Sequence, residues 1–282
     1  MEPIIRNITD TARWVAVYRA DESERTDAIF HDPFARMLAG THGENIVQAM
    51  EHGRKNSWSF VARTYLFDKL ILNHIKNNFT LILNLASGLD ARPFRLDLPK
   101  ELCWIDVDLP EMNTYINEKM TAQKPRCNQE RISIDLSNRE ERLVLFDNIN
   151  QRNKKTLILA EGLVGYLKDD EVGALAFDLS HFKNFRHWAL DLMSPGILPL
   201  INEEMGTLLE DARTPLIFAP SEGEDFFQLF GWNAIASYSK LKTAGYLNRL
   251  PKEMHQFASQ PEPEGPKGDF PWSGVCLFEN RL

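Results

Sequence analysis

The strongest constraint on the fold comes from residues 81–92, where an apolar run gives way to small residues around Gly88 and then to the acid Asp90. A short continuous apolar run is typical of a strand buried in a parallel sheet. Small residues after it allow the turning backbone to approach a ligand closely. In open α/β sheets, ligands bind beyond the carboxyl ends of the strands. The stretch therefore predicts the first strand and the ligand-binding turn of an α/β domain.

Apolar runs that end in acidic residues recur along the chain. The run at residues 102–110 places Asp106 and Asp108 about 20 residues after the first turn, the spacing at which an acid reaches ribose hydroxyls. Helical-looking segments separate the runs, and this alternation predicts a parallel sheet. The later runs are residues 131–136 with Asp135, residues 156–162 with Glu161, and residues 187–192.

Each of these features also has a purely structural interpretation. A glycine can end a strand for steric reasons, and Asp106 and Asp108 could cap the helix that Pro110 opens or face solvent. The turn has neither the Gly-Lys-Ser/Thr ending of a phosphate-binding loop nor the Gly-x-Gly-x-x-Gly pattern of a dinucleotide site. Asp90 would repel a pyrophosphate, so the turn favours a cationic ligand.

Several short motifs follow one another in a fixed order along most of the chain, at residues 11–20, 32–35, 63–64, 85–92, 106–110, 161–167 and 272–275. Together they resemble the leucine carboxyl methyltransferase family, specifically its bacterial polyketide O-methyltransferase-like branch. The resemblance implies a class I methyltransferase (Rossmann-like) α/β fold, with a mostly parallel seven-stranded sheet and helices on both faces. It also implies S-adenosylmethionine as the methyl donor.

The resemblance also implies binding roles for individual residues. It assigns Arg63 to the methionine carboxylate of the donor, although a lone arginine could equally lie on a solvated helical face. Family members often have Gly-Ala-Gly where this chain has Ala86-Ser87-Gly88, and an alanine fits there if its φ is negative. The other assignments are Ala86, Ser87 and Gly88 to the methionine moiety, Asp108 or alternatively Asp106 to the ribose, Asp135 and Leu136 to the adenine, and Glu161 and Gly162 to the floor beneath the donor.

The chain is expected to form a single domain. Amphipathic spacing predicts helices at residues 28–38 and 58–75, and a further helix is expected at residues 198–212. Long insertions in compact domains tend to be lids or binding loops. The expected parts are a helical cap at 1–78, a donor-binding core at 79–193, a lid or acceptor-side insertion at 194–231, and final strands, expected to be antiparallel, at 232–282.

Composition excludes several other classes. The 282-residue chain has a net charge of −8 and no basic stripe, so a nucleic-acid partner is not expected. No apolar run is long enough to span a membrane and no signal peptide is visible, so no membrane partner is expected. The odd number of cysteines, two of them in expected strands, predicts a reducing, cytoplasmic setting. Three cysteines without paired spacing predict no metal site.

The expected function is S-adenosylmethionine-dependent O-methylation of a carboxyl or hydroxyl group on a small, polyketide-like acceptor. A carboxylate acceptor needs no general base, whereas a hydroxyl would benefit from one, for which His181 or His187 could serve. No catalytic residue is assigned. The alternatives are an NAD(P)-binding oxidoreductase and a non-catalytic module that binds S-adenosylmethionine. The identity of the acceptor and the oligomeric state stay open.

Overall fold

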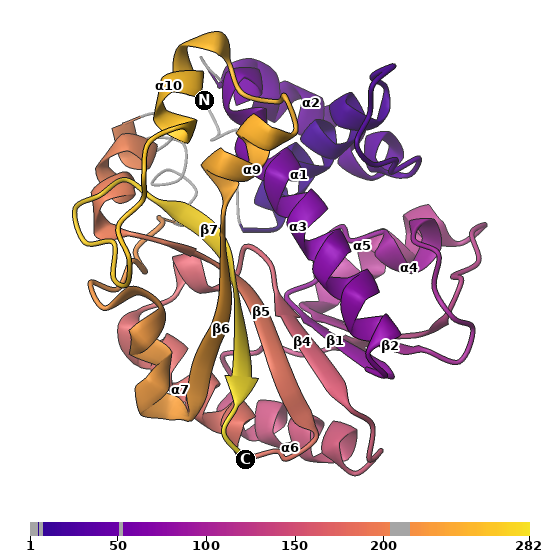
Figure 1. Cartoon of the computed structure of the whole chain (residues 1–282). Helices are drawn as coiled ribbons and strands as arrows, with labels where there is room; N and C mark the ends of the chain where they lie inside the picture. The colour runs from indigo at the N-terminus through magenta and orange to yellow at the C-terminus, as the bar shows by residue number, and fades with distance from the viewer. Residues whose placement is uncertain (1–4, 6–7, 51–52, 204–214) are drawn as a thin grey trace.

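The computed structural model describes residues 5, 8–50, 53–203 and 215–282 (Figure 1). Its centre is a seven-stranded sheet in the order β3-β2-β1-β4-β5-β7-β6. Strands β1 to β5 are parallel, and β7 runs antiparallel to both β5 and β6. The prediction of a mostly parallel sheet with antiparallel final strands is confirmed. The strands are β1 Leu81–Leu85, β2 Cys103–Asp108, β3 Asn128–Ser133, β4 Thr156–Ala160, β5 Phe185–Met193, β6 Trp232–Ser239 and β7 Ser273–Asn280.

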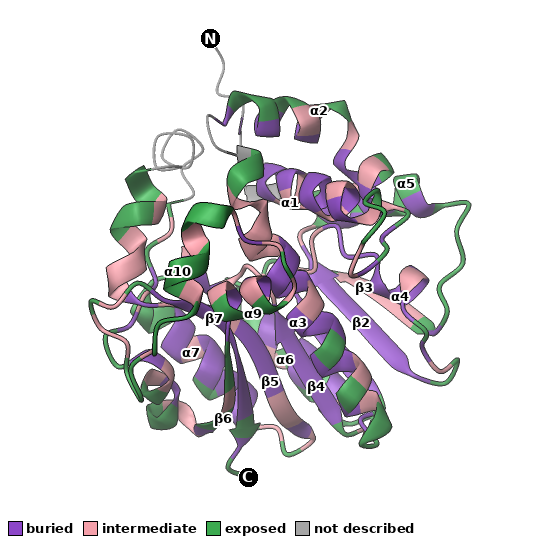
Figure 2. Ribbon diagram, turned by 45° about the horizontal axis from the view of Figure 1, so that its top comes forward, coloured by how far each residue is buried: buried purple, intermediate pink, exposed green. Residues whose placement is uncertain are grey.

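Helices cover both faces of this sheet (Figure 1). Alternate residues of β1 point to opposite faces, Leu83 into the cluster that includes α6 and α7 and Ile82 into the cluster that includes α3. Because both faces are covered, β1 is apolar except at Asn84, and Figure 2 shows the central strands as largely buried. The longer helices are α1 Ile8–Ser23, α2 Ala35–Ala49, α3 Ser57–Lys76, α5 Pro110–Met120, α6 Arg139–Asn150 and α7 Asp169–Ser180.

Shorter helices connect these elements. None of the helices among the described residues is both long and apolar enough to cross a membrane. The short helices are α4 Arg92–Arg95, α9 Lys240–Tyr246 and α10 His255–Ala258, with the 3-10 turns η1 Gly53–Asn56, η2 Val164–Tyr166, η3 Pro195–Ile197, η4 Gly223–Phe230 and η5 Lys252–Met254.

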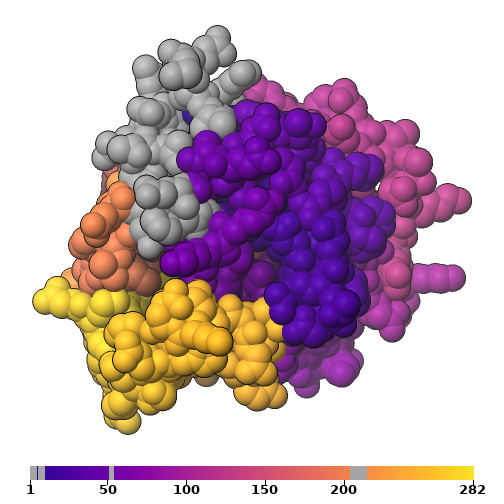
Figure 3. Space-filling model, turned by 90° about the horizontal axis from the view of Figure 1, so that it is seen from above, coloured from indigo at the N-terminus to yellow at the C-terminus, as the bar shows by residue number. Residues whose placement is uncertain are grey.

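The N-terminal helices form a cap over the carboxyl ends of the parallel strands. Trp14 and Val17 of α1 pack with Leu38 of α2, Met112 of α5 and Leu89 of the turn after β1. Seen from above, the N-terminal part of the chain, in indigo and purple, lies over the middle of this end of the molecule, between the yellow C-terminal part and the magenta part (Figure 3). The cap therefore closes over the point where a ligand would approach the sheet.

The predicted boundaries of the cap helices are right for α3 and wrong for residues 28–38. A helix begins only at Ala35, because Pro33 disfavours a helical conformation at the residue before it. The carboxylate of Asp32 accepts hydrogen bonds from the Phe34 amide and from the Arg19 guanidinium, which stabilises the non-helical connection. The helix expected at 198–212 is present at 198–203 and its remainder lies outside the described residues.

Candidate functional site

A cavity of about 470 Å³ lies beyond the carboxyl ends of β1, β2 and β4. The strand order reverses between β1 and β4, which is where ligands bind in open α/β sheets. Residues of α1, such as Ala12 and Arg19, form the wall opposite the sheet. Of the residues singled out from the sequence, Arg63, Ala86, Ser87, Gly88, Asp108, Asp135, Leu136, Glu161 and Gly162 line the cavity, and Asp106 does not.

The turn after β1 is attached to the end of β2. Gly88 has a φ of +53°, and its amide donates a hydrogen bond of 2.6 Å to Oδ2 of Asp108. A Cβ atom at this position would lie 3.3 Å from the Cβ of Ala12 in α1. Glycine is therefore required at position 88 for two reasons: the backbone is left-handed there, and helix α1 of the cap approaches it closely.

Ala86 departs from the expectation of a negative φ, because its φ is +50°. The Cβ of an L-residue in the left-handed region lies close to the following carbonyl oxygen, which costs roughly 1–2 kcal/mol. Ala86 thus holds a left-handed backbone conformation that glycine adopts more readily.

Ala86→Gly should consequently stabilise the folded protein. Relief of backbone strain is partly offset by the greater freedom of glycine in the unfolded chain, so the expected gain is up to about 1 kcal/mol. Urea unfolding followed by circular dichroism measures it. Ala91→Gly, where φ is −107°, is the matched control and should lose stability. A loss for Ala86→Gly as large as for Ala91→Gly would show that the turn is unstrained.

The structure separates the two acids proposed for the ribose. Asp106 is 1% exposed, and its carboxylate accepts hydrogen bonds from the side chains of Asn84, Trp104 and Gln129 at 2.6–3.0 Å. Burial raises the pKa of Asp106 to about 6. Asp108 accepts hydrogen bonds from two backbone amides, those of Gly88 and Leu109, and it lines the cavity. The geometry thus favours Asp108, because the carboxylate of Asp106 lies in a buried network of its own.

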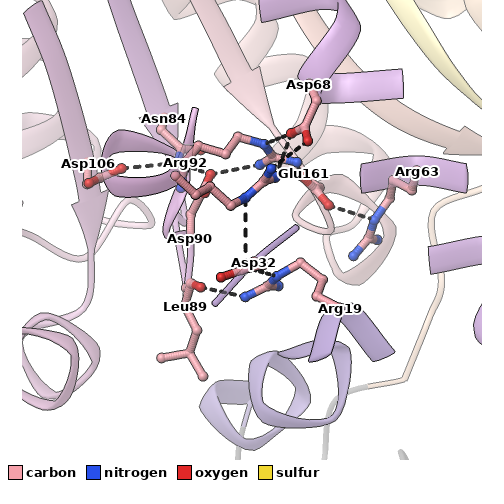
Figure 4. A network of polar contacts seen from close by, with 12 residues as sticks. Arg19, Asp32, Arg63, Asp68, Asn84, Leu89, Asp90, Arg92, Asp106 and Glu161 are labelled. Carbon is pink, nitrogen blue, oxygen red and sulfur yellow. Dashed lines mark hydrogen bonds and ion pairs between the residues drawn. The ribbon is translucent and has the colours of Figure 1, made fainter. Parts of the chain in front are cut away.

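Glu161 is held between two arginines at the end of β4 (Figure 4). Its Oε1 accepts a hydrogen bond of 3.0 Å from Nε of Arg63, and its Oε2 lies 2.8 Å from Nη2 of Arg92. Burial alone would raise the pKa of Glu161, but the charges of Arg92 and Arg63 outweigh it and bring the pKa to about 2. Glu161 is therefore a permanent anion at neutral pH.

Arg92 joins this pair to the turn after β1 and to α3. It is 4% exposed, and it donates to Asp90 at 2.7 Å and to Asp68 at 2.6 Å. Asn84 also donates to Asp90, at 3.1 Å. From the sequence, the negative charge of Asp90 is expected to favour a cationic ligand. In the structure that charge is paired with the guanidinium of Arg92. No role is assigned to Asn84 or Arg92 from the sequence. Asn84 could have been noticed because it is a polar residue inside an otherwise apolar run.

A further acid, Asp191 of β5, lies behind the cavity wall. Its Oδ1 accepts a hydrogen bond of 2.6 Å from the Gly162 amide, and its Oδ2 accepts one of 3.0 Å from Nη1 of Arg63. Gly162 has a φ of +70°, and a Cβ there would lie 3.3 Å from the same Arg63 atom. No role is assigned to Asp191 from the sequence. The only clue to it in the sequence is that an acid interrupts an apolar strand.

At the other end of the cavity, the backbone after β3 is braced by side chains. Asp135 accepts a hydrogen bond from the Ser137 amide at 2.9 Å. The Leu136 carbonyl accepts one of 2.7 Å from Arg142, which also pairs with the buried Asp178. The residues assigned to the adenine therefore lie in a supported loop.

The two histidines considered as general bases lie elsewhere. His181 is exposed at the end of α7, and a ring nitrogen lies 2.7 Å from the Phe177 carbonyl. His187 is hydrogen-bonded to His74 at 2.8 Å, and burial lowers its pKa to about 4. No histidine among the described residues lines the cavity.

The model of the family described as leucine carboxyl methyltransferase matches residues 12–179. A candidate S-adenosyl-L-methionine-dependent methyltransferase of Mycobacteroides abscessus is 31% identical over 195 residues, 62% of this chain and 62% of the relative. One from a Parafrankia species is 29% identical over 216 residues, 72% of this chain and 66% of the relative. These matches span less than two thirds of the length of either relative.

Two crystal structures share the fold at low sequence identity. A DUF574 family protein from Streptomyces avermitilis has a TM-score of 0.57 at 11% identity, covering 96% of this chain and 97% of the other. A candidate methyltransferase from Thermobifida fusca has a TM-score of 0.57 at 14% identity, covering 99% and 96%. The match to the family model extends over more than half of the sequence, and the chain belongs to the leucine carboxyl methyltransferase family.

Proposed function

We propose that this chain is an S-adenosylmethionine-dependent methyltransferase that transfers a methyl group to an oxygen of a small-molecule acceptor, with a carboxylate as the acceptor group. One observation carries the proposal. A single cavity at the switch point of the sheet brings together the strand-end acid Asp108, the glycine turn at Gly88 and the buried pair of Arg63 and Glu161. Family membership and the names of the relatives support the same donor.

The charges in this cavity suit the donor. S-adenosylmethionine, when bound, supplies a methyl group on a positively charged sulfur. Asp108 would accept hydrogen bonds from the ribose hydroxyls, and Arg63 would bind the methionine carboxylate. Glu161, ionised between two arginines, supplies negative charge on the same wall. Alignment of the acceptor oxygen with the methyl carbon is the main work of such a site and can supply roughly 7–11 kcal/mol.

Ligand binding tests the donor directly. Titration calorimetry with S-adenosylmethionine should give a saturable heat, and heat denaturation of the purified protein followed by mass spectrometry should release the donor or its demethylated product. Release of a dinucleotide would instead support the oxidoreductase alternative. Binding without transfer of a labelled methyl group to any acceptor would support a non-catalytic module.

The residues that line the cavity support a carboxylate as the acceptor group. Neither His181 nor His187 reaches it, and Glu161, with a pKa of about 2, is too weak a base to deprotonate a hydroxyl. A carboxylic acid, with a pKa of about 4, is already ionised at neutral pH and needs no base. Apolar side chains such as Val15, Phe60 and Leu163 line the same cavity, which fits an acceptor with an apolar body.

The pH dependence of turnover distinguishes the two acceptor classes. With a carboxylic acid acceptor, the rate should be nearly flat above pH 6, because the nucleophile is fully ionised there. The product should be a methyl ester that base hydrolyses, and His181→Ala and His187→Ala should each retain most of the activity. A base-stable methyl ether, formed at a rate that rises through a pKa near 7, would establish a hydroxyl acceptor with general-base assistance.

A further inference from the structure

Asp191 is a buried acid that contacts two parts of the cavity wall without lining the cavity itself. Its side chain is 11% exposed, and each of its carboxylate oxygens has a different partner in that wall. Oδ1 accepts the hydrogen bond of the Gly162 amide at 2.6 Å, and Oδ2 accepts that of Arg63 Nη1 at 3.0 Å. One carboxylate thus joins a backbone turn to a guanidinium.

The sheet explains why this acid lies beside Glu161. Strands β4 and β5 are parallel, and Ala160 pairs with Leu190. Glu161 follows Ala160 just beyond the end of β4, and Asp191 follows Leu190 within β5, so the two acids lie on neighbouring strands at the same level of the sheet. Their carboxylates bind different nitrogens of the same guanidinium, Nε and Nη1 of Arg63.

These two contacts determine the orientation of Arg63. A guanidinium is planar, so hydrogen bonds at Nε and Nη1 fix its plane and the direction of Nη2. Arg63 is 9% exposed and lines the cavity. The absence of a side chain at Gly162 also matters, because a Cβ there would lie 3.3 Å from Nη1. Asp191 therefore binds both the backbone turn at Gly162 and the guanidinium of Arg63, which packs against that turn.

We propose that Asp191 is a positioning residue for the methionine carboxylate of the donor, acting through Arg63 and Gly162. The inference rests on the proposed function, because it concerns the group that Arg63 binds there. Asp191 holds the guanidinium in the orientation in which the cavity receives a carboxylate. It does not touch the donor itself.

A positioning role and a simple charge effect predict opposite changes in the affinity for the donor carboxylate when Asp191 is neutralised. Removing a negative charge near the binding region would strengthen the binding of an anionic group if only the net charge mattered. Asp191→Asn also replaces an acceptor with an amide that cannot satisfy both the Gly162 amide and Arg63 in the same way. Loss of the orientation should weaken carboxylate binding, so the sign of the effect separates the two explanations.

The experiment compares three ligands by titration calorimetry on the full chain. S-adenosylmethionine and S-adenosylhomocysteine carry the amino acid carboxylate, whereas 5′-methylthioadenosine has the nucleoside without it. Asp191→Asn should weaken the first two by tenfold or more and change the third by less than twofold. Glu130→Gln removes the acid of an exposed ion pair with Arg152, away from the cavity, and should change none of them.

A double-mutant cycle with Arg63 tests whether Asp191 influences carboxylate binding through the guanidinium of Arg63. In an Arg63→Ala background, Asp191→Asn should cause no further loss that is selective for the two carboxylate ligands, because the guanidinium proposed to bind their carboxylate is gone. If Asp191→Asn does not fold, Asp191→Glu keeps the charge and moves the carboxylate, and it should also weaken the two carboxylate ligands selectively.

The outcomes that contradict the inference are distinct from failure of the proposed function. Unchanged or tighter binding of the donor by the folded variant overturns the positioning role, as does an equal loss for all three ligands. If the parent protein binds none of the three ligands, the proposed function fails and the inference fails with it.

Discussion

Gly88→Val should abolish binding of S-adenosylmethionine, with an expected loss of more than about 100-fold. A β-branched residue at a φ of +53° is a genuine backbone outlier, so the turn would have to change its conformation. That change would break the hydrogen bond from the Gly88 amide to Asp108. The new side chain would also meet Ala12 of the cap, which a Cβ atom already approaches to 3.3 Å. Titration calorimetry on the folded variant measures the loss.

The chain offers a matched control for the backbone strain. Gly265 has a φ of +70°, it is exposed, and a Cβ there would have no neighbour within 4 Å. Gly265→Val therefore introduces a comparable left-handed valine far from any close contact. It should lose some stability and bind the donor like the parent. If Gly88→Val also binds like the parent, the turn after β1 is not the donor site.

Most of the fold is predictable because its signals are local. The two innermost strands, β1 and β4, are covered on both faces, so each appears as an almost entirely apolar run that can be recognised without knowledge of its partner strands. The carboxyl ends of parallel strands meet at one edge, so acids at the ends of successive runs are expected to gather there. The strand ends Gly88, Asp108 and Glu161 indeed line one cavity.

The rest depends on contacts between residues far apart in the sequence. Arg63 and Asp191 are separated by 128 positions, and no local pattern indicates that they meet. The left-handed alanine at position 86 is likewise invisible, because its strain is tolerated only where the surrounding sheet holds the turn. The helix expected at 28–38 fails for a different and local reason, because Pro33 disfavours a helical conformation at Asp32, and the contact of Asp32 with Arg19 of another helix only adds to this effect.

Asp108→Ala should weaken binding of S-adenosylmethionine by about 1.5–3 kcal/mol, the range for hydrogen bonds to a charged group, or about 10- to 150-fold. Burial raises the pKa of Asp108, whereas the hydrogen bonds from the Gly88 and Leu109 amides lower it and favour the ionised form. Alanine removes both the acceptor proposed for the ribose and the anchor of the turn. Calorimetry with the donor gives the loss, and circular dichroism checks that the variant is folded.

Asp106→Asn separates this role from a general effect of losing an acid on β2. Asp106 is two residues away on the same strand, but its carboxylate is enclosed by Asn84, Trp104 and Gln129 and does not line the cavity. An amide of the same shape can keep part of that network, so donor binding should stay within about threefold of the parent. The reverse pattern, a large loss for Asp106→Asn and none for Asp108→Ala, would transfer the ribose role to Asp106 and refute the geometry argued from the cavity.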